Sequence, residues 1–413
     1  MCYTQNRFNA LLSACVMSLI ATAGWSQQPS LRWLGTLPGY DNSSYAYGVS
    51  ADGSVVVGGA RNAAVQWRAF RWTASGGMQN LGTLGGDWSA ANGVSADGAV
   101  VVGVALNAAG YERAFRWTAS GGMQDLGTLP GYDWSFAYAV SADGAVVVGG
   151  AYAVRQRRAF RWTVDGGMQD LGTFGGDESA ALGVSADGAV VVGLAENAAR
   201  QYRAFRWTVD GGMQDLGTLG GNWSVAFGVS ADGAVVVGYA RNAAGQERAF
   251  RWTASGGMQD LGTLPRYDRS FAFDVSADGS VVVGWAYNAA GRERAFRWTA
   301  AGGMEDLNRT YARLLTNGSE LTAATAISPN GRYIVGLGYN AATNRTEAFL
   351  LDTRCTAHNG DMNGDGAVDD ADLLQVLFAL GNFCVGCPED LNGDNWVDDA
   401  DLLIVLSHFG SGC

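Results

Sequence analysis

The chain has 413 residues, of which 48% are hydrophobic and only six are proline, so it can bury a large core and is not a disordered protein. It carries a net charge of −12 and contains no lysine, and its arginines recur singly along the chain. Nucleic-acid binding requires a concentrated basic surface, so this composition excludes nucleic acid as an expected partner.

The N-terminal residues 1–26 are predicted to be a secretory signal peptide. A single arginine precedes an apolar stretch, residues 10–23, that is too short to span a bilayer and ends in small residues. Cleavage is expected after Ala23 or Ser26, and lipoprotein processing at Cys15 is the alternative. We therefore expect a secreted or cell-surface protein whose mature chain has no transmembrane segment.

A sequence repeat fills most of the remaining chain. Its tryptophans recur at intervals of 45 or 46 residues, at Trp72, Trp117, Trp162, Trp207, Trp252 and Trp298. Phe349 takes the corresponding place in a seventh, more divergent copy. A unit of this length cannot bury an apolar face by itself, so the copies must stack on one another.

Each copy contains four short β-rich runs separated by turn signals. In the third copy these runs are residues 136–141, 146–149, 159–163 and 168–173. Between the first two runs stands an Asp-Gly pair, here beginning at Asp143, and this pair is typical of a tight hairpin turn. A catalytic role for the repeated aspartate is the alternative, but its recurrence at six hairpin tips, with Asn330 at the seventh, favours a role in the turn.

The third and fourth runs predict a cross-strand ion pair. If residues 74–77 form the loop between them, Thr73 lies opposite Met78 and Arg71 opposite Asn80. The same register predicts the pairs Arg116–Asp125, Arg161–Asp170, Arg206–Asp215, Arg251–Asp260 and Arg297–Asp306. Pairs repeated at one register position are expected to stabilise the sheets rather than to act on a ligand.

The two ends of the repeat region are complementary. It opens with an unpartnered run of the fourth type, residues 34–37, and ends with a run of the third type, residues 347–350. If the first strand completes the last sheet, every sheet has four strands and a ring forms. We therefore predict an all-β domain over residues 31–352, a seven-bladed β-propeller in which the N-terminal strand closes the last blade.

These motifs resemble a bacterial extracellular repeat family named for its His-Ala-Phe signature, in which Gly-x-Ser-x-Asp-Gly, Val-Val-Gly, Ala-Phe-x-Trp and Leu-Gly-Thr-Leu recur. The resemblance implies an exported protein of repeat structure and carries no established activity. Arginine or glutamate stands where the family often has histidine, at Arg68, Arg113, Arg158, Arg203, Arg248, Arg294 and Glu347. A histidine ring that binds a metal or catalyses a reaction is therefore not expected.

The connections between blades carry the candidate ligand-binding residues. Aromatic side chains beside carboxylates suit a sugar ring or a peptide. The candidates are Tyr40, Asp87, Trp88, Tyr132, Trp134, Trp223 and Tyr267. One alternative is purely structural, with the aspartates capping turns and the aromatic rings covering blade edges. Another is a glycoside hydrolase that uses Asp133, Asp177 or Glu178 as acid and base, although the leading interpretation assigns no catalytic residue.

The tail, residues 353–413, holds most of the negative charge and two calcium-loop patterns. Oxygen ligands recur at loop positions 1, 3, 5, 7, 9 and 12, where position 7 donates a backbone carbonyl. The first loop offers Asp361, Asn363, Asp365, Ala367, Asp369 and Asp372, and the second Asp390, Asn392, Asp394, Trp396, Asp398 and Asp401. We expect two Ca²⁺ ions, whose binding orders the tail.

An amphipathic helix is expected after each loop, and none before it, so the tail reads as a duplicated half EF-hand. This pattern resembles a type I dockerin over residues 361–410. The resemblance implies attachment to a cohesin-like or other cell-surface protein and, by association, a place in polysaccharide breakdown. The sequence departs from dockerins at residues 370–371 and 399–400, where Asp-Ala replaces the usual hydroxyl pair.

The mature chain keeps four cysteines, all in the tail: Cys355, Cys384, Cys387 and Cys413. An even number of cysteines in an exported protein indicates two disulfides, and because they bracket the loop–helix units we expect the pairs Cys355–Cys384 and Cys387–Cys413. Zinc held by four thiolates is the alternative.

Together these patterns predict a secreted, monomeric, non-catalytic binding or scaffold protein with a carbohydrate or protein ligand. The alternatives are a glycoside hydrolase built on the propeller and a purely structural surface repeat.

Overall fold

The computed structural model describes residues 29–353, 370–383, 389 and 396–408. The predicted signal peptide, all four tail cysteines and several of the predicted calcium ligands lie outside these residues. The chain divides into two compact units, and each is described by itself here: Ser30–Asp352, and a second unit to which the described tail residues belong. No described helix is both long and apolar enough to cross a membrane.

Ser30–Asp352 consists almost entirely of β-strands, which follow the repeat. The first strands are β2 (Ser43–Val49), β6 (Gly85–Val94), β10 (Trp134–Val140), β14 (Gly175–Val184), β18 (Gly220–Val229), β22 (Arg269–Val275) and β26 (Glu320–Ile327). The second strands are β3 (Val55–Arg61), β7 (Val100–Asn107), β11 (Val146–Ala153), β15 (Val190–Asn197), β19 (Val235–Asn242), β23 (Val281–Tyr287) and β27 (Tyr333–Asn340).

The third and fourth strands complete each repeat. The third strands are β4 (Trp67–Thr73), β8 (Glu112–Thr118), β12 (Gln156–Thr163), β16 (Tyr202–Thr208), β20 (Glu247–Thr253), β24 (Glu293–Thr299) and β28 (Arg345–Asp352). The fourth strands are β5 (Gly77–Asn80), β9 (Gly122–Asp125), β13 (Gly167–Asp170), β17 (Gly212–Asp215), β21 (Gly257–Asp260) and β25 (Gly303–Asp306). A short helix, α2 (Leu307–Thr310), and a 3₁₀ turn, η1 (Ala312–Leu314), follow β25.

Each repeat pairs its four strands antiparallel in chain order, and we number the repeats 1 to 7 by their first strands. Repeats 3 and 4 are joined into one larger sheet by a single parallel bridge between Arg157 and Glu178. In repeat 7 the fourth place is taken by β1 (Ser30–Trp33), which pairs antiparallel with β28. The N-terminal strand therefore completes the sheet formed by the last strands of the unit.

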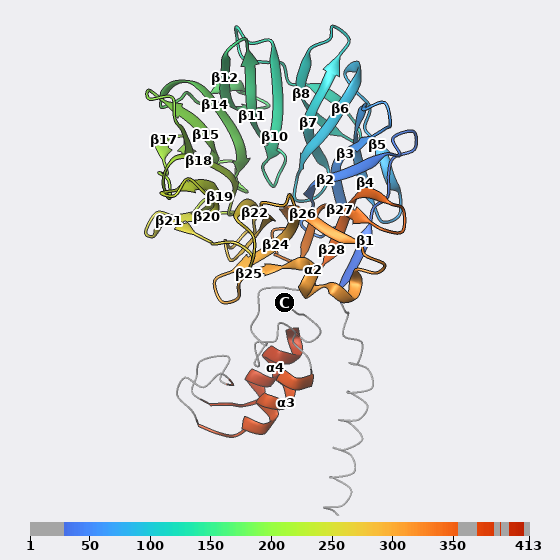
Figure 1. Ribbon diagram of the computed structural model, residues 1–413, viewed down its shortest axis with the longest axis vertical. Coiled ribbons are helices and arrows are strands. Elements are labelled where there is room, and N and C mark those ends of the chain that lie inside the picture. The colour runs from blue at the N-terminus through green and yellow to red at the C-terminus, as the bar shows by residue number, and fades with distance from the viewer. Residues whose placement is uncertain (1–28, 354–369, 384–388, 390–395, 409–413) are drawn as a thin grey trace, which may run out of the picture. The chain divides into compact units, whose positions relative to one another are not determined.

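The sheets follow one another around a common centre (Figure 1). Each first strand contacts the first strand of the next repeat, and β2 also contacts β26, β27 and β28 of repeat 7. The first strands therefore form the inner wall of the unit, and the fourth strands lie farthest from the centre.

The core lies between neighbouring sheets because the second strands are apolar on both faces. Between repeats 1 and 2, for example, Val55 and Val57 pack against Val101 and Phe115. The phenylalanine of the third strand has no exposed surface in any of the seven repeats: Phe70, Phe115, Phe160, Phe205, Phe250, Phe296 and Phe349. Every sheet thus buries side chains against its neighbours, as the repeat length predicts.

The glycine that ends each Val-Val-Val-Gly run is required by the first strand. The backbone of β10 passes so close to Gly149 that a Cβ there would lie 1.9 Å from the Phe136 carbonyl oxygen. The register between β10 and β11 shifts at the same place, between Ala137 and Ala139. A bulge in the inner strand therefore explains this glycine.

A buried serine joins each of the first six repeats to the sheet before it. In β10, the Ser135 Oγ accepts a hydrogen bond from the Ala114 amide (2.9 Å) and donates one to the Gly127 carbonyl (2.5 Å), both in repeat 2. The same two bonds are made by Ser44, Ser89, Ser179, Ser224 and Ser270. Ser44 makes them to Ala348 and Gly35, so it joins β2 to repeat 7.

Backbone hydrogen bonds also link the hairpin turns around the centre. The amides of Ala51, Ala96, Ala142, Ala186, Ala231 and Ala277 each donate to the corresponding carbonyl of the next repeat, at 2.9–3.2 Å. In repeat 7 the corresponding residue is Pro329, which accepts from Ala277 but has no N–H to donate to Ala51. This belt of hydrogen bonds therefore has one gap, between repeats 7 and 1.

Two expectations about register were wrong. Gly122 adopts a positive φ of 64° and pairs with Thr118, so the loop before the fourth strand has three residues rather than four. Arg116 consequently faces Gln124, and its Nε donates to the Gly144 carbonyl of the next repeat at 3.3 Å. The predicted ion pairs with the aspartates do not form at this register.

The other corrections concern the remaining arginine pair and the closing strand. Arg297 pairs with Glu305, one residue before the expected Asp306. The strand that completes the last sheet is β1, four residues before the predicted run at residues 34–37, because the fourth strand directly precedes the Leu-Gly-Thr segment in repeats 1 to 5 as well.

Among the described residues of the second unit are two helices, α3 (Asp370–Ala379) and α4 (Asp399–His408), where the sequence predicts them. Val376, Val397 and Val405 form its small core. Phe383 and Trp396 meet in an isolated antiparallel bridge with their rings edge to face at 5.2 Å. The described part of this unit is therefore a helix pair beside a short bridge.

A candidate binding cavity at the centre of the repeats

The repeated aspartates are turn residues. In repeat 4 the Asp187 Oδ1 accepts hydrogen bonds from the Ser185 hydroxyl (2.6 Å) and the Ala189 amide (2.9 Å). These bonds, led by the one from Ser185, lower the pKa of Asp187 below its usual value, and the pKa values of Asp52, Asp97, Asp143, Asp232 and Asp278 are lowered too. The seventh copy uses Asn330 with the same two contacts. This arrangement supports the structural interpretation of the Asp-Gly motif.

Arginines at the histidine position of the family motif hold the connections between repeats. Arg113 and Arg248 donate to the carbonyls of Asp133 and Asp268, and Arg158 donates to the Asp177 carbonyl at 2.8 Å. Arg68 instead donates to the Tyr40 hydroxyl, with Nε at 2.9 Å. These side chains shape the connections that carry the predicted ligand-binding residues, a role that sequence analysis did not assign to them.

The predicted ligand-binding residues are distributed over separate repeats. Tyr40, Tyr132 and Tyr267 are partly buried and pack on the cores between repeats 7 and 1, 2 and 3, and 5 and 6, respectively. Trp88, Trp134 and Trp223 are partly buried as well, whereas Asp87 is exposed. None of these seven residues lines the cavity described below. These residues therefore lie on separate connections and do not form one pocket.

Two of the three carboxylates of the hydrolase alternative already have partners. The Glu178 Oε2 accepts from the Tyr202 hydroxyl (2.7 Å) and lies 3.3 Å from Arg157 Nη2. Asp177 forms an exposed ion pair with Arg200 at 3.1 Å. Asp133 is exposed, and its backbone carbonyl is the acceptor for Arg113.

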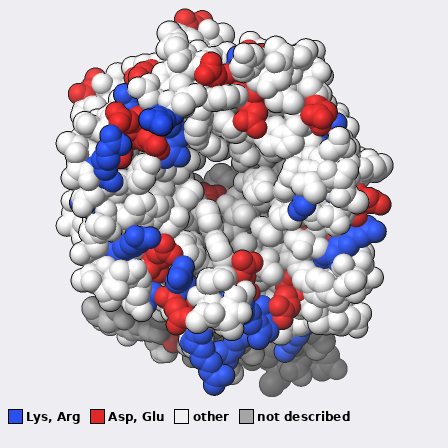
Figure 2. All heavy atoms as spheres, turned by 45° about the horizontal axis from the view of Figure 1, so that its top comes forward, with Lys and Arg blue, Asp and Glu red and all other residues white. Residues whose placement is uncertain are grey.

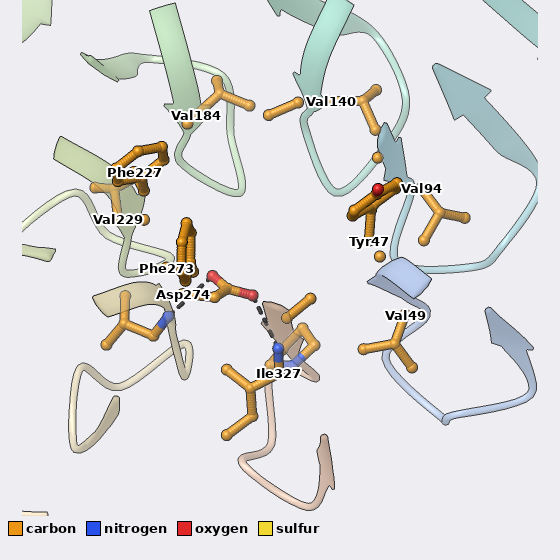
Figure 3. A pocket seen from close by; sticks show the side chains of 18 of the residues that line it. Tyr47, Val49, Val94, Val140, Val184, Phe227, Val229, Phe273, Asp274 and Ile327 are labelled. Atoms are coloured by element: carbon orange, nitrogen blue, oxygen red, sulfur yellow. Dashed lines mark hydrogen bonds between the residues drawn. The ribbon is translucent and has the colours of Figure 1, made fainter. Parts of the chain in front are cut away.

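The first strands surround a central cavity of about 570 Å³. Every repeat contributes the same positions of its first strand, including the valine or isoleucine before the hairpin turn and the residue two places earlier. The latter are Tyr47, Asn92, Tyr138, Leu182, Phe227, Phe273 and Thr325. Four of these seven side chains are aromatic. Figure 3 shows Val49, Val94, Val140, Val184 and Val229 around the opening.

Asp274 breaks the repeat inside this cavity. The equivalent position holds glycine in four repeats and alanine in two, namely Gly48, Gly93, Ala139, Gly183, Gly228 and Ala326. One Asp274 carboxylate oxygen accepts from the Val275 amide (2.9 Å) and the other from the Ile327 amide of repeat 7 (2.9 Å) (Figure 3). Burial raises its pKa from 3.8 to about 6, against the opposing effect of these two bonds.

Sequence analysis missed Asp274, although an alignment of the seven copies contains the signal. The motif Gly-Val-Ser-Ala-Asp-Gly or Ala-Val-Ser-Ala-Asp-Gly becomes Asp-Val-Ser-Ala-Asp-Gly in repeat 6 alone. The repeated aspartate directly before the turn glycine, present in six copies, drew attention to the wrong carboxylate. A residue that departs from an otherwise constant position is the more informative one.

Aromatic side chains of repeats 5 and 6 continue from the cavity wall. The Phe227 and Phe273 rings lie 5.1 Å apart, and Phe227 stacks on Tyr239 at 5.7 Å. Tyr239 also contacts Trp223 and Phe271, each with ring centroids 4.7 Å apart. At the Tyr239 and Phe271 positions this group departs from other copies, which have Val104 or Leu194 and Ala90 or Ala180 there.

The space-filling view shows a hollow at the centre of the repeats (Figure 2). Charged side chains gather on the surrounding rim, and most of the atoms within the hollow belong to uncharged residues. Among the residues that line the cavity, Asp274 is the one with a charged side chain, and the lining contains no arginine.

The chain matches no protein-family model and no curated protein. Solved structures share its fold. Oligogalacturonate lyase from Vibrio parahaemolyticus has 11% identity and a TM-score of 0.50, over 79% of this chain and 97% of that chain. The β-propeller domain of the Trilobed protease from Pyrococcus furiosus has 12% identity and a TM-score of 0.48, over 79% of this chain and 94% of that domain.

The fold is a β-propeller, because antiparallel sheets of four strands follow one another around a common centre. TolB from Acinetobacter baumannii is also similar, with 13% identity and a TM-score of 0.45 over 62% of this chain, which spans 63% of the TolB chain. Identities this low establish the fold alone and transfer no activity to this propeller.

Three predicted calcium ligands with side-chain oxygens lie among the described tail residues. Asp372 and Asp401, in the first turns of α3 and α4, are fully buried. Asp398 accepts from the Ala400 amide at 2.8 Å, as an N-cap residue does, and its own amide donates to Asp401 Oδ2 at 2.9 Å. The backbone-ligand candidate Trp396 has a half-exposed side chain, and the remaining loop residues lie outside the described part.

Proposed function

We propose that the protein is a secreted, monomeric, non-catalytic binding protein built on a seven-bladed propeller, with a calcium-ordered, dockerin-like tail that attaches it to a cohesin-like or other cell-surface partner. The supporting observation for seven blades is the antiparallel pairing of four strands in each of the seven repeats, with β1 in the last. The resemblance to exported His-Ala-Phe repeats supports secretion.

A binding role is favoured over hydrolysis by the composition of the cavity. Glycoside hydrolases of the common types use two carboxyl groups that flank the scissile bond. The cavity lining contains one carboxylate, Asp274, among uncharged side chains at repeated positions. This single observation carries the proposal of a non-catalytic protein.

The proposed ligand of the connections that carry Tyr40, Asp87, Trp88, Tyr132, Trp134, Trp223 and Tyr267 is a carbohydrate or a protein segment. The support is chemical: the partly buried Trp88 and Trp134 each directly follow an exposed aspartate in the sequence, and Trp223 follows an exposed asparagine. Such surfaces bind sugars by stacking and hydrogen bonding. A link to polysaccharide breakdown rests on the dockerin resemblance of the tail.

The test is a glycan array probed with the full mature chain, with calcium and with chelator. Binding of a defined glycan class that is weakened by Trp134→Ala and unchanged by Val154→Ala would support ligand binding at the connections between repeats. Val154→Ala is the control because Val154 is an exposed side chain at a hairpin tip. Release of reducing sugar from a bound glycan would instead establish the hydrolase alternative.

A further inference from the structure

Asp274 carries a buried negative charge without a positive partner. Two backbone amides bond its oxygens, and no basic side chain in the described part of the chain lines the cavity or forms an ion pair with it. Carboxylates removed from water are normally paired with a cation or lose their charge. The side chain nevertheless keeps some surface open to the cavity, so a bound molecule can reach it.

The walls around this carboxylate are suited to a cation. Phe227, Phe273, Tyr47 and Tyr138 each contribute to the lining. The faces of aromatic rings attract organic cations, and ammonium groups are bound in proteins by aromatic walls of this kind. An apolar wall with one anion also disfavours phosphates, carboxylates and sulfates.

We propose that the central cavity binds a small organic ammonium ion, with Asp274 as its counter-ion and the aromatic side chains of the first strands as its walls. The volume of about 570 Å³ lies within the range of small-molecule sites. None of the predicted ligand-binding residues of the connections lines this cavity, so the proposal does not depend on the function proposed above.

Affinity for the cation is expected to rise with pH. The carboxylate must be ionised to act as counter-ion, and its pKa of about 6 places that change between pH 5 and 7. The other titratable lining groups, Tyr47 and Tyr138, have pKa values raised by burial and stay neutral there. On the strands packed against Asp274, the charged residues Arg269 and Glu320 begin β22 and β26, and neither lines the cavity.

The experiment compares trimethylammonium compounds with neutral isosteres of the same shape. Tetramethylammonium, choline and benzyltrimethylammonium are titrated into the full mature chain by calorimetry at pH 5.0 and 7.5, beside their tert-butyl analogues. We expect at least one cation to bind about tenfold more tightly than its analogue at pH 7.5, and more weakly at pH 5.0. Equal binding of the pair, or binding of no cation, would overturn the proposal.

Two variants identify the site. Asp274→Asn removes the charge and keeps the shape, and Asp274→Gly restores the residue found at this position in four other repeats, so both are expected to fold. Both should abolish the preference for the cation and its pH dependence. Asp187→Asn, which removes one carboxylate from an exposed turn, should leave both unchanged. Cation binding that survives in both Asp274 variants would show that the cavity is not the site.

Discussion

The buried Ser135 hydroxyl lies at the joint between repeats 2 and 3 and makes two hydrogen bonds to the sheet of repeat 2. Replacing Ser135 by alanine would leave the Ala114 amide and the Gly127 carbonyl without that partner in a dry environment. We expect a loss of about 1–3 kcal/mol in the free energy of unfolding, measured by denaturant titration. Ser54→Ala is the control, because Ser54 is exposed and alanine stands there in four other repeats. An equal loss of stability in both variants would contradict the stabilising role of the Ser135 hydrogen bonds.

The turn aspartates also act at the scale of single residues, because their contribution to the free energy of unfolding depends on pH. The folded-state pKa of Asp187 is lowered, so its contribution is complete above the pKa of the unfolded chain and is lost as pH falls through the lower folded value. Asp187→Asn should preserve stability at pH 7, since Asn330 makes the same contacts, and should lessen the loss in acid. Thermal unfolding between pH 2.5 and 7 measures both. A steeper acid loss in the variant would refute this assignment.

Single residues were the least predictable part of the site. Periodicity locates a strand and its buried face, but it does not say where a repeated arginine finds its acceptor, because that acceptor can lie in the next repeat. Arg116 bonds to Gly144, in the following hairpin turn, and not to the facing strand. Asp274, by contrast, could have been found by asking which copy departs from the rest.

At the scale of the strand, the bulge in each inner strand controls which residue its partner can carry. Gly149→Ala would place a Cβ against the Phe136 carbonyl oxygen, and a backbone atom cannot move aside without breaking the hairpin. We expect a loss of about 3 kcal/mol or more in the free energy of unfolding, or failure to fold. Circular dichroism and denaturant titration of the purified chain measure the effect.

The adjacent glycine supplies the control for that substitution. At Gly150 a Cβ would meet only the movable Tyr152 side chain, and valine, leucine and tyrosine stand there in other repeats, as Val104, Leu194 and Tyr239. Gly150→Ala should therefore change stability little. Similar losses at the two positions would mean that the bulge does not select the glycine.

Elements were predicted well where the pattern was strong, and less well at their ends. The Val-Val-Val-Gly and Ala-Phe-Arg-Trp runs are strands in the structure, and a helix covers each predicted position in the tail. The fourth strand was misplaced because its first glycine was assigned to the loop, although a glycine with positive φ can pair within a hairpin. That one-residue difference altered every arginine partner.

At the scale of the whole molecule, the propeller and the tail are expected to respond separately to calcium. Removing calcium with a chelator should unfold α3 and α4, because the loop carboxylates would repel one another without a cation. Helical circular dichroism should fall, and the β-sheet signal and the main unfolding transition should stay unchanged. Asp401→Asn should mimic the chelator for the second loop. A helical signal that is insensitive to both treatments would contradict calcium dependence.

The missing belt hydrogen bond at Pro329 makes the joint between repeats 7 and 1 different from the other six. Six joints are held by a chain connection and by the alanine belt together, whereas the joint between repeats 7 and 1 has no belt hydrogen bond and is connected along the chain only through β1. It relies on β1, on Ser44 and on the Thr325 hydroxyl, which bonds the Ala46 carbonyl at 2.7 Å. A pulling force applied to the N-terminus would therefore detach β1 from β28 first. The propeller would then open between repeats 7 and 1 before any other joint between repeats separates.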